Sequence, residues 1–341
     1  MNWTVPSSDY SPKKPLFLCV LSTTDIAKVP GISGAGKTPE YTPAGDAEIV
    51  MLGATHSIDE PPMTNGTPTP AVITRASMEL TGVPCLFVDA GLRVRPELPL
   101  LNVGASPSAD IRTGRAVANP ATIVEQSFLL GRQLSKTFDF VVIGESVPGG
   151  TTTALGVLRA IGYDAMVSSS FSKNPVEIKN QVVNEAMSKN NIFFGDLKDD
   201  PLKAVELFGD SMMPAVVGLV KGLSGVDTVL AGGTQMMAVL AIIKHLDIGG
   251  DIAIATTKFI AEDKTANFSD TVSTLGYKAY ISDPGFSKAR FEGLRMYEAG
   301  DVKDGVGAGG AMFLANLLGI GQSKFRDKVD EICTAIMKSS N

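Results

Sequence analysis

The architecture of this chain is set by Phe138-Asp-Phe-Val-Val-Ile-Gly-Glu-Ser-Val-Pro-Gly-Gly-Thr-Thr-Thr153. The apolar residues 138–143 predict a buried strand, and the apolar residues 154–161 beyond the turn predict a helix. The turn begins with Glu145, and its Gly149-Gly150 pair lets the backbone approach a ligand closely because glycine has no Cβ. The first N–H groups of a helix have no partner within it, and its dipole favours negative charge there. These residues therefore predict an anion-binding turn between a strand and a helix.

Two further glycine turns lead into apolar helices, and the first of them also follows a short apolar strand. One is Val229-Leu-Ala-Gly-Gly-Thr-Gln235 before the apolar residues 236–243, and the other is Asp304-Gly-Val-Gly-Ala-Gly-Gly310 before residues 311–318. In open parallel sheets, ligands bind at the carboxyl ends of the strands. A single Gly-Gly turn is common in ordinary α/β domains. Three of them, two headed by an acid, predict a site for a phosphate-bearing ligand with a carboxylate near its reactive end.

The composition narrows the class of protein. With 341 residues, 44% hydrophobic and 19% charged, the chain is expected to be a globular protein with a large core. A net charge of −6 without a stripe of basic residues argues against nucleic acid and anionic membranes as partners. The most apolar window, residues 228–243, is interrupted by Gly-Gly-Thr-Gln, so no membrane span is expected. Three scattered cysteines and an N-terminus without an apolar signal region predict a cytoplasmic protein.

Alternating strands and helices with unbroken apolar strands predict an α/β fold, a Rossmann-like parallel sheet covered by helices on both faces. The chain ends are expected to add a smaller, mostly helical lobe. The expected strands are residues 16–21, 85–88, 138–143, 228–230, 252–255 and 278–281, with a possible strand at 48–52 in a long loop region, 25–62. The expected helices are residues 70–80, 120–134, 154–161, 175–187, 202–208, 213–222, 236–243, 287–298, 311–318 and 323–338, and residues 1–14 are expected to form a flexible arm.

The domain organisation expected from this pattern is one catalytic unit over residues 1–341. Within it, residues 65–285 are expected to form the α/β sheet core. Residues 286–341 are expected to form a helical segment that packs with the N-terminal region as the smaller lobe.

The segment Gly31-Ile-Ser-Gly-Ala-Gly-Lys-Thr38 formally matches the P-loop of nucleoside triphosphatases. That loop works only between a buried strand and a helix. Here Pro30 precedes the first glycine and Pro39 follows Thr38, and a residue before proline is disfavoured in the α region. A helix that begins at Lys37 is therefore not expected. The segment is interpreted as a surface turn.

Other common chemistries do not fit the motifs. The G-x-S-x-G turn of serine hydrolases is missing, and no early strand leads into G-x-G-x-x-G followed by a ribose-binding acid. No Asp-Asp pair ends an apolar strand before a Thr-Gly loop, as ordinary phosphoribosyltransferases would require. A group transfer that needs a phosphate-binding site and one general base stays open.

The motifs resemble those of a known family in the family's own order. Gly144-Glu145 followed by a glycine and Thr-Thr resembles the Gly-Glu…Gly…Thr-Thr loop of nicotinate-nucleotide:dimethylbenzimidazole phosphoribosyltransferases, which make the lower nucleotide of cobamides. The other similar segments are Asp89-Ala-Gly91, Ile111-Arg-Thr-Gly114, Gly232-Gly233, Ser282-Asp-Pro-Gly285 and Asp304-Gly-Val-Gly-Ala308. The resemblance runs from about Pro70 to Leu318 and is greatest to a divergent, largely archaeal branch of that family.

This resemblance implies a transferase that moves ribose 5-phosphate from nicotinate mononucleotide to a benzimidazole-like base, forming alpha-ribazole 5′-phosphate. It also implies a homodimer, and the chemistry needs neither cofactor nor metal. Nicotinate leaves as a neutral pyridine, so a single carboxylate base suffices, and burial would raise its pKa toward neutrality.

The resemblance assigns the base to Asp304, where the family has glutamate. An alignment slipped by two residues would place Val306 there, and Glu145 is then the second candidate, with helix capping as its alternative role. The residues expected to bind phosphate or nucleotide are Gly149, Gly150, Thr151, Thr152, Gly232, Gly233, Thr234, Gly305 and Gly307. The residues expected near the acceptor base are Asp89, Thr67, Thr74 and Ser282.

Three departures from the family pattern keep a second function open. Aspartate replaces glutamate at 304, Gln235-Met236 replaces Glu-Ile, and Phe286 stands where a histidine is usual. A carboxylate one methylene shorter reaches less far, and misplacement by about an ångström costs on the order of a hundredfold in rate. The alternative is therefore a non-catalytic nucleotide-binding or sensor protein on the same scaffold.

Overall fold

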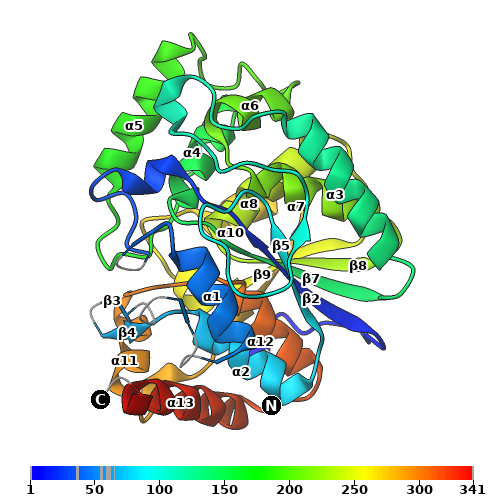
Figure 1. The fold of residues 1–341 in the computed structure, drawn as a ribbon, viewed down its shortest axis with the longest axis vertical. Helices are drawn as coiled ribbons and strands as arrows, with labels where there is room; N and C mark the ends of the chain where they lie inside the picture. Colours follow the sequence, from blue (N-terminus) through cyan, green and yellow to red (C-terminus); the bar gives the residue numbers. More distant parts are fainter. Residues whose placement is uncertain (1, 36–37, 54–56, 59–62, 65, 340–341) are drawn as a thin grey trace.

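The fold is an eight-stranded sheet between two layers of helices (Figure 1). The structure is a computed structural model that describes residues 2–35, 38–53, 57–58, 63–64 and 66–339. Its strands are β1 (Thr4–Val5), β2 (Pro15–Leu21), β3 (Met63–Thr64), β4 (Thr67–Pro68), β5 (Cys85–Asp89), β6 (Leu101–Asn102), β7 (Phe140–Ser146), β8 (Asp227–Ala231), β9 (Ile252–Thr257) and β10 (Lys278–Ser282).

The α-helices are α1 (Thr42–Met51), α2 (Ala71–Thr81), α3 (Pro120–Leu134), α4 (Gly150–Ala160), α5 (Val176–Lys189), α6 (Pro201–Phe208), α7 (Met212–Gly222), α8 (Thr234–His245), α9 (Lys258–Ala261), α10 (Phe268–Leu275), α11 (Glu292–Arg295), α12 (Ala308–Leu317) and α13 (Gln322–Ser339). Short 3-10 helices are η1 (Asp25–Lys28), η3 (Ile111–Thr113), η4 (Phe286–Lys288) and η5 (Met296–Ala299).

The strand order explains where a ligand would bind. The order is β1-β10-β9-β8-β7-β2-β5-β6, and every neighbouring pair is parallel except β1 with β10. The chain runs from β2 to β5 and β6 on one side, and then returns to place β7 on the other side of β2. The topology therefore switches between β2 and β7, and in such sheets the crevice at the carboxyl ends of the two switch strands is the usual ligand site.

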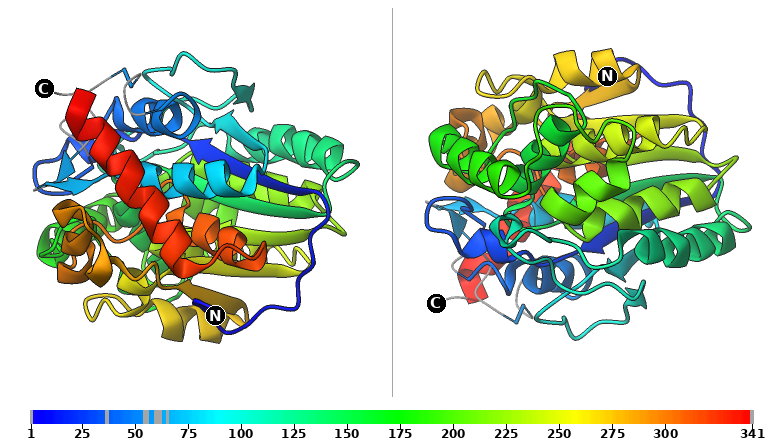
Figure 2. Two further views of the ribbon diagram at one scale, coloured as in Figure 1. Left: turned by 90° about the horizontal axis from the view of Figure 1, so that it is seen from below. Right: turned by 90° about the horizontal axis from the view of Figure 1, so that it is seen from above.

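The alternation of side chains along the strands builds two hydrophobic cores. In β2, Leu16, Leu18 and Val20 face the core of α3 to α8, and the residues between them face α1, α2, α12 and α13. Figure 2 shows the layer that contains α13 from below and the layer that contains α3 to α7 from above. The Rossmann-like fold class predicted from sequence is confirmed, and the helices near both chain ends pack together on one face.

The predicted elements from Pro70 to residue 281 lie close to the observed ones, and α3 has the predicted bounds. Three predictions outside this region were wrong. The N-terminal residues are not a flexible arm, because β1 pairs with β10 and Trp3 donates a hydrogen bond to the Ile320 carbonyl at 2.8 Å. The sheet therefore begins before residue 65, since β1 and β2 both belong to it.

The predicted strand at residues 48–52 is the end of helix α1. Pro43 stands at its first turn, where proline is favoured, and Ala44 and Ala47 are buried. The predicted helix at residues 287–298 is broken into η4, α11 and η5. Asp330 accepts hydrogen bonds from the amides of Arg290 and Phe291, at 3.0 and 2.8 Å, and these bonds hold the chain out of a continuous helix.

The turn that contains Asp304 lies directly on the sheet because two glycines meet there. A Cβ on Gly144 of β7 would lie 2.8 Å from the Cα of Gly307, and Gly307 has a φ of +66°. Both positions therefore require glycine if α12 is to begin at the centre of the sheet. Within the described residues, no helix is long and apolar enough to cross a membrane.

Candidate active site

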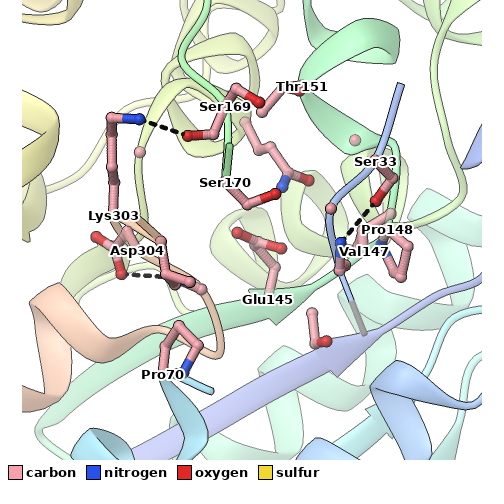
Figure 3. Close-up of a pocket in the computed structure, with 18 of the residues that line it drawn as sticks. Ser33, Pro70, Glu145, Val147, Pro148, Thr151, Ser169, Ser170, Lys303 and Asp304 are labelled. Carbon is pink, nitrogen blue, oxygen red and sulfur yellow. Dashed lines mark hydrogen bonds between the residues drawn. The ribbon is translucent and has the colours of Figure 1, made fainter. Parts of the chain in front are cut away.

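A cavity opens where β7 and β8 end, beside the switch point between β2 and β7 (Figure 3). All three glycine turns line it, through residues 147–151, 233–235 and 304–306. The helices α4, α8 and α12 begin at these turns. The cavity therefore faces three helix N-termini, as expected from the sequence, and its other walls come from residues 32–35, 42, 46, 69–70 and 168–170.

The structure brings most of the predicted catalytic and phosphate-binding residues together. Those that line the cavity are Glu145, Gly149, Gly150, Thr151, Gly233, Thr234, Asp304 and Gly305. The other three, Thr152, Gly232 and Gly307, belong to the same turns but do not line it. Gly232 has a φ of +156°, and an added Cβ would lie 3.0 Å from Cγ of Met236 and in ordinary contact, at 3.4 Å, with Oε1 of Glu145.

The four residues predicted to lie near the acceptor base do not line this cavity. Asp89 caps its own loop, because one oxygen accepts from the amides of Gly91 and Leu92, both at 3.0 Å. The Ser282 hydroxyl pairs with that of Thr4 at 3.0 Å, at the β1 edge of the sheet. Thr74 donates to the carbonyl of Val306 at 2.9 Å and so supports the turn from behind. Thr67 is buried in β4 and does not line the cavity.

Glu145 projects from the end of β7 into the middle of the cavity (Figure 3). Its side chain is buried, and burial raises the pKa of its carboxyl well above the usual value, with further increases from Asp304, Asp210 and Asp46. A hydrogen bond from the amide of Val147 acts in the opposite direction. Within the described residues no side chain donates to it, so its oxygens keep acceptor capacity for a ligand.

Asp304 is bonded quite differently. One oxygen accepts from the amides of Gly305 at 2.8 Å and Gly309 at 3.1 Å. The other accepts from the Thr256 hydroxyl at 3.0 Å and from the Thr257 amide at 3.3 Å. Burial raises the pKa of Asp304 to about 6 in spite of these four bonds. A carboxylate has about four acceptor positions, so all of them are occupied by the protein.

Two more buried acids lie near Glu145. Asp46 of α1 lines the cavity and accepts from the hydroxyls of Thr69 and Ser146, both at 2.8 Å. Asp210 precedes α7 and accepts from the Thr153 hydroxyl at 2.5 Å, and its second oxygen has no hydrogen-bond partner among the described residues. Burial raises the pKa of each to about 6.

We expect Asp210→Asn to stabilise the protein at pH 8 and to stabilise it about half as much at pH 5. The folded pKa of about 6 lies above the usual 3.8, so stability is lost as pH rises through this interval. Two units correspond to roughly 3 kcal/mol, and asparagine keeps an oxygen for Thr153. Urea unfolding at the two pH values measures the effect. Equal stability of both proteins at pH 8 would contradict it, and Asp199→Asn on the exposed surface is the control.

Relatives of known sequence place the chain in a family. No protein-family model matches it. It is 52% identical over 342 residues to a UPF0284 protein of Methanosarcina mazei, covering 98% of each chain. It is 46% identical over 335 residues to a UPF0284 protein of Methanothermobacter thermautotrophicus, covering 94% of this chain and 93% of the relative. The chain belongs to the UPF0284 family.

Solved structures share the fold of this UPF0284 protein. The nicotinate-nucleotide-dimethylbenzimidazole phosphoribosyltransferase from Thermus thermophilus matches with a TM-score of 0.61 at 15% identity, over 95% of this chain and 83% of that one. CobT from the same organism matches with a TM-score of 0.59 at 14% identity, over 95% and 84%. At this identity the likeness establishes a common fold. The motifs predicted that the chain resembles this phosphoribosyltransferase family as a divergent, largely archaeal branch. The shared fold and the archaeal relatives confirm that resemblance.

Sequence analysis missed several parts of the cavity of this UPF0284 protein. Residues 168–170, Ser-Ser-Ser, and the neighbouring Lys303 line it, as does Asp46. The P-loop-like segment was interpreted as a surface turn, yet residues 32–35 line the cavity. Gly36 and Lys37 lie outside the described residues, and the next helix begins only at Thr42. Of these missed residues, only the three consecutive serines at 168–170 form a pattern in the sequence that could have indicated a polar site.

Among the described residues, no group of three His, Cys, Asp or Glu side chains is placed to hold a metal ion. The three buried or half-buried cysteines are unpaired. The groups that the cavity offers to a ligand are amide N–H groups, hydroxyls and carboxylates.

Proposed function

We propose that this UPF0284 protein transfers the 5-phosphoribosyl group of nicotinate mononucleotide to a benzimidazole-like base. One observation carries the proposal: a single cavity joins three helix N-termini to a buried carboxylate, Glu145, that keeps free acceptor positions. The shared fold with the phosphoribosyltransferase from Thermus thermophilus supports it.

The N-termini of three helices are proposed to bind the phosphate. α4, α8 and α12 have 11, 12 and 10 residues and begin at the edge of the cavity. Their unpaired amides and their dipoles favour an anion at that place. Gly149, with a φ of +80°, turns the chain so that α4 can begin there. The phosphate is therefore assigned to the wall formed by Gly150, Thr151 and Thr234.

Glu145 is assigned as the general base. In the reaction, one ring nitrogen of the acceptor forms the bond to C1′ while the bond from C1′ to the pyridinium nitrogen breaks. The electron pair of that bond stays on nicotinate, which leaves as a neutral pyridine and needs no proton. The second ring nitrogen of the acceptor gives its proton to the carboxylate of Glu145. Burial raises the pKa of this carboxyl above its usual value, which makes its carboxylate a stronger base for this step.

We assign Asp304 a positioning role, whereas the motif predicted that it is the general base. Its four hydrogen bonds connect the end of β9 with the start of α12, and they leave no acceptor position for an incoming proton. It also raises the pKa of Glu145 through its negative charge.

Release of nicotinate tests the proposal. Purified protein is mixed with nicotinate mononucleotide and dimethylbenzimidazole, and nicotinate and the ribotide product are separated and quantified over time. We expect both products in equal amounts, and none without the acceptor base. Tight binding of the mononucleotide without release would instead favour the sensor protein that the shortened acid at position 304 suggested. The same assay with other heterocycles ranks the acceptors, and sedimentation tests the expected homodimer.

A further inference from the structure

Two buried lysines hold one wall of the cavity. Lys303 is 5% exposed, and its Nζ donates to the carbonyls of Ser169 at 2.9 Å and Phe171 at 3.0 Å. Lys179 of α5 is 1% exposed, and its Nζ donates to the carbonyl of Ser168 at 2.6 Å and to the Asn174 side chain at 3.2 Å. Lysines are almost never buried to this extent without a specific partner, and here the main partners are peptide carbonyls.

The carbonyls of residues 168–171 all accept hydrogen bonds. Ser168 and Ser169 are held by the lysines as described, and the Ser170 carbonyl accepts from the amide of Val302 at 3.0 Å. In a planar trans peptide, the N–H of the next residue points opposite to the carbonyl. The amides of Ser169 and Ser170 therefore point away from the lysines. Both serines line the cavity, and Figure 3 shows the side chain of Lys303 extending to Ser169, with Ser170 next to Ser169.

A hydrogen-bond donor on a carbonyl also strengthens the N–H on the other side of the same peptide. Hydrogen bonds in a chain polarise one another, and the effect is larger in a medium of low dielectric constant. The peptide 168–169 has Lys179 on its oxygen, and the peptide 169–170 has Lys303. Asp263 lies 3.8 Å from Lys303 and accepts from the Ser168 hydroxyl at 2.5 Å, which fixes the segment further.

The backbone next to Lys303 is strained, which indicates that its position is imposed by its surroundings. Val302 and Val306 have φ values of +50° and +54°. This left-handed region is unfavourable for β-branched residues, so the surrounding structure must hold these positions in place. The two strained valines flank Lys303 and Asp304. The side chain of Lys303 reaches the segment 168–171, and the side chain of Asp304 reaches the start of α12.

We propose that Lys303 and Lys179 are positioning residues that hold segment 168–171 with the amides of Ser169 and Ser170 facing the substrate phosphate, opposite the N-terminus of α4. The inference rests on the proposed function, because the phosphate is that of the mononucleotide. The Ser168 amide donates to the Thr234 hydroxyl at 3.2 Å, so the segment is joined to α8 as well. The phosphate site thus has two walls, one of helix N-termini and one that the lysines keep in place.

Calorimetry with ligands that differ only in the phosphate tests this. We expect Lys303→Met to weaken the binding of nicotinate mononucleotide by roughly tenfold or more, since hydrogen bonds to charged groups are lost or misplaced. Binding of nicotinate riboside, which has no phosphate, should change less than twofold. In turnover, KM for the mononucleotide should rise more than kcat falls. Lys258→Met is the matched control, because Lys258 is largely buried in ion pairs with Asp283 and Glu298 and does not line the cavity.

An equal loss of affinity for both ligands, or no loss for either, would overturn the inference. Lys303→Gln, which keeps a donor and removes the charge, replaces the methionine variant if that protein does not fold. Inorganic phosphate separates this inference from the proposed function. If the wild type binds phosphate in a Lys303-dependent way but does not bind the mononucleotide, the two-walled anion site stands and the proposed reaction is wrong.

Discussion

Replacement of Glu145 by glutamine is expected to reduce kcat for nicotinate release by on the order of 10²–10⁴-fold, the usual contribution of a positioned general base. Glutamine has the same shape and lacks only the ability to accept the proton. The dissociation constant of nicotinate mononucleotide should stay within a few-fold, because the role proposed for Glu145 is to receive a proton from the acceptor and not to bind the phosphate. Single-turnover kinetics with saturating acceptor and calorimetry with the mononucleotide measure the two quantities.

The pH profile distinguishes this role from a structural one. The base is active when ionised, and burial raises its pKa above the usual value of 4.5, so activity should fall as pH decreases through that raised pKa. Asp210→Asn removes one of the negative charges that raise this pKa and should shift the fall to lower pH. Glu125→Gln on the exposed face of α3 is the control. A glutamine variant of Glu145 with wild-type kcat would remove Glu145 from the mechanism.

Replacement of Asp304 is expected to affect stability more than catalysis, because the protein fills the acceptor positions of Asp304 and leaves those of Glu145 free. In Asp304→Asn an amide group replaces one oxygen, and it faces the Thr257 amide that now donates to that oxygen. We expect a loss of about 1–3 kcal/mol in the free energy of unfolding, typical for a mismatched buried hydrogen bond. We expect a smaller fall in kcat than for Glu145→Gln, because the base is still present. If Asp304→Asn instead loses more activity than Glu145→Gln without loss of stability, the base is Asp304.

Much of this arrangement could be predicted from local sequence. Two of the glycine turns follow an apolar strand, and parallel strands end at one edge of a sheet. The turns after β7 and β8 therefore had to lie near each other if these strands were neighbours, as they are. The turn at 304–310 follows η5 instead, and it reaches the same edge through the hydrogen bonds of Asp304 with Thr256 and Thr257 of β9. The identity of the base could not be predicted in this way. The choice between Glu145 and Asp304 depends on which carboxylate has its acceptor positions filled, and Asp304 is bonded partly by Thr256 and Thr257, almost 50 residues earlier.

Other parts of the site depend on contacts that no local pattern contains. The three serines at 168–170 become a cavity wall only because Lys179 and Lys303 bind their carbonyls, and Lys303 is more than 130 residues away. Likewise Asp89 has the spacing of a ligand-binding acid, but its oxygens are used by Gly91, Leu92 and an ion pair with Arg95 at 3.1 Å. Trp3 was predicted to belong to a flexible arm. Its partners, Ile320 and Phe325, lie near the other terminus, so no local pattern could indicate them.

Gly310→Ala is expected to destabilise the protein by about 3 kcal/mol or more, at the upper end of what an added core methyl group costs. Gly310 lies on the face of α12 that rests on the sheet, and an added Cβ would overlap the Cβ of Ala231 in β8 and lie 3.0 Å from a methyl group of Val142 in β7. The higher helix propensity of alanine offsets only about 1 kcal/mol. α12 must therefore move away from the sheet, and since it carries Gly305 and Asp304 at its start, activity should fall together with stability.

The matched control is Gly319→Ala just beyond the end of the same helix, where nothing lies within 4 Å of the added Cβ and only the left-handed φ of +85° opposes it. We expect that variant to lose about 1 kcal/mol and to keep its activity. The double variant Gly310→Ala with Ala231→Gly moves the methyl group from strand to helix and should recover part of the loss, which urea unfolding of all four proteins measures. If Gly310→Ala is as stable as Gly319→Ala, α12 does not lie this close to the sheet. The site built on the start of α12 would then have to be placed anew, because Asp304 reaches Gly309 and the end of β9 only when that helix touches the strands.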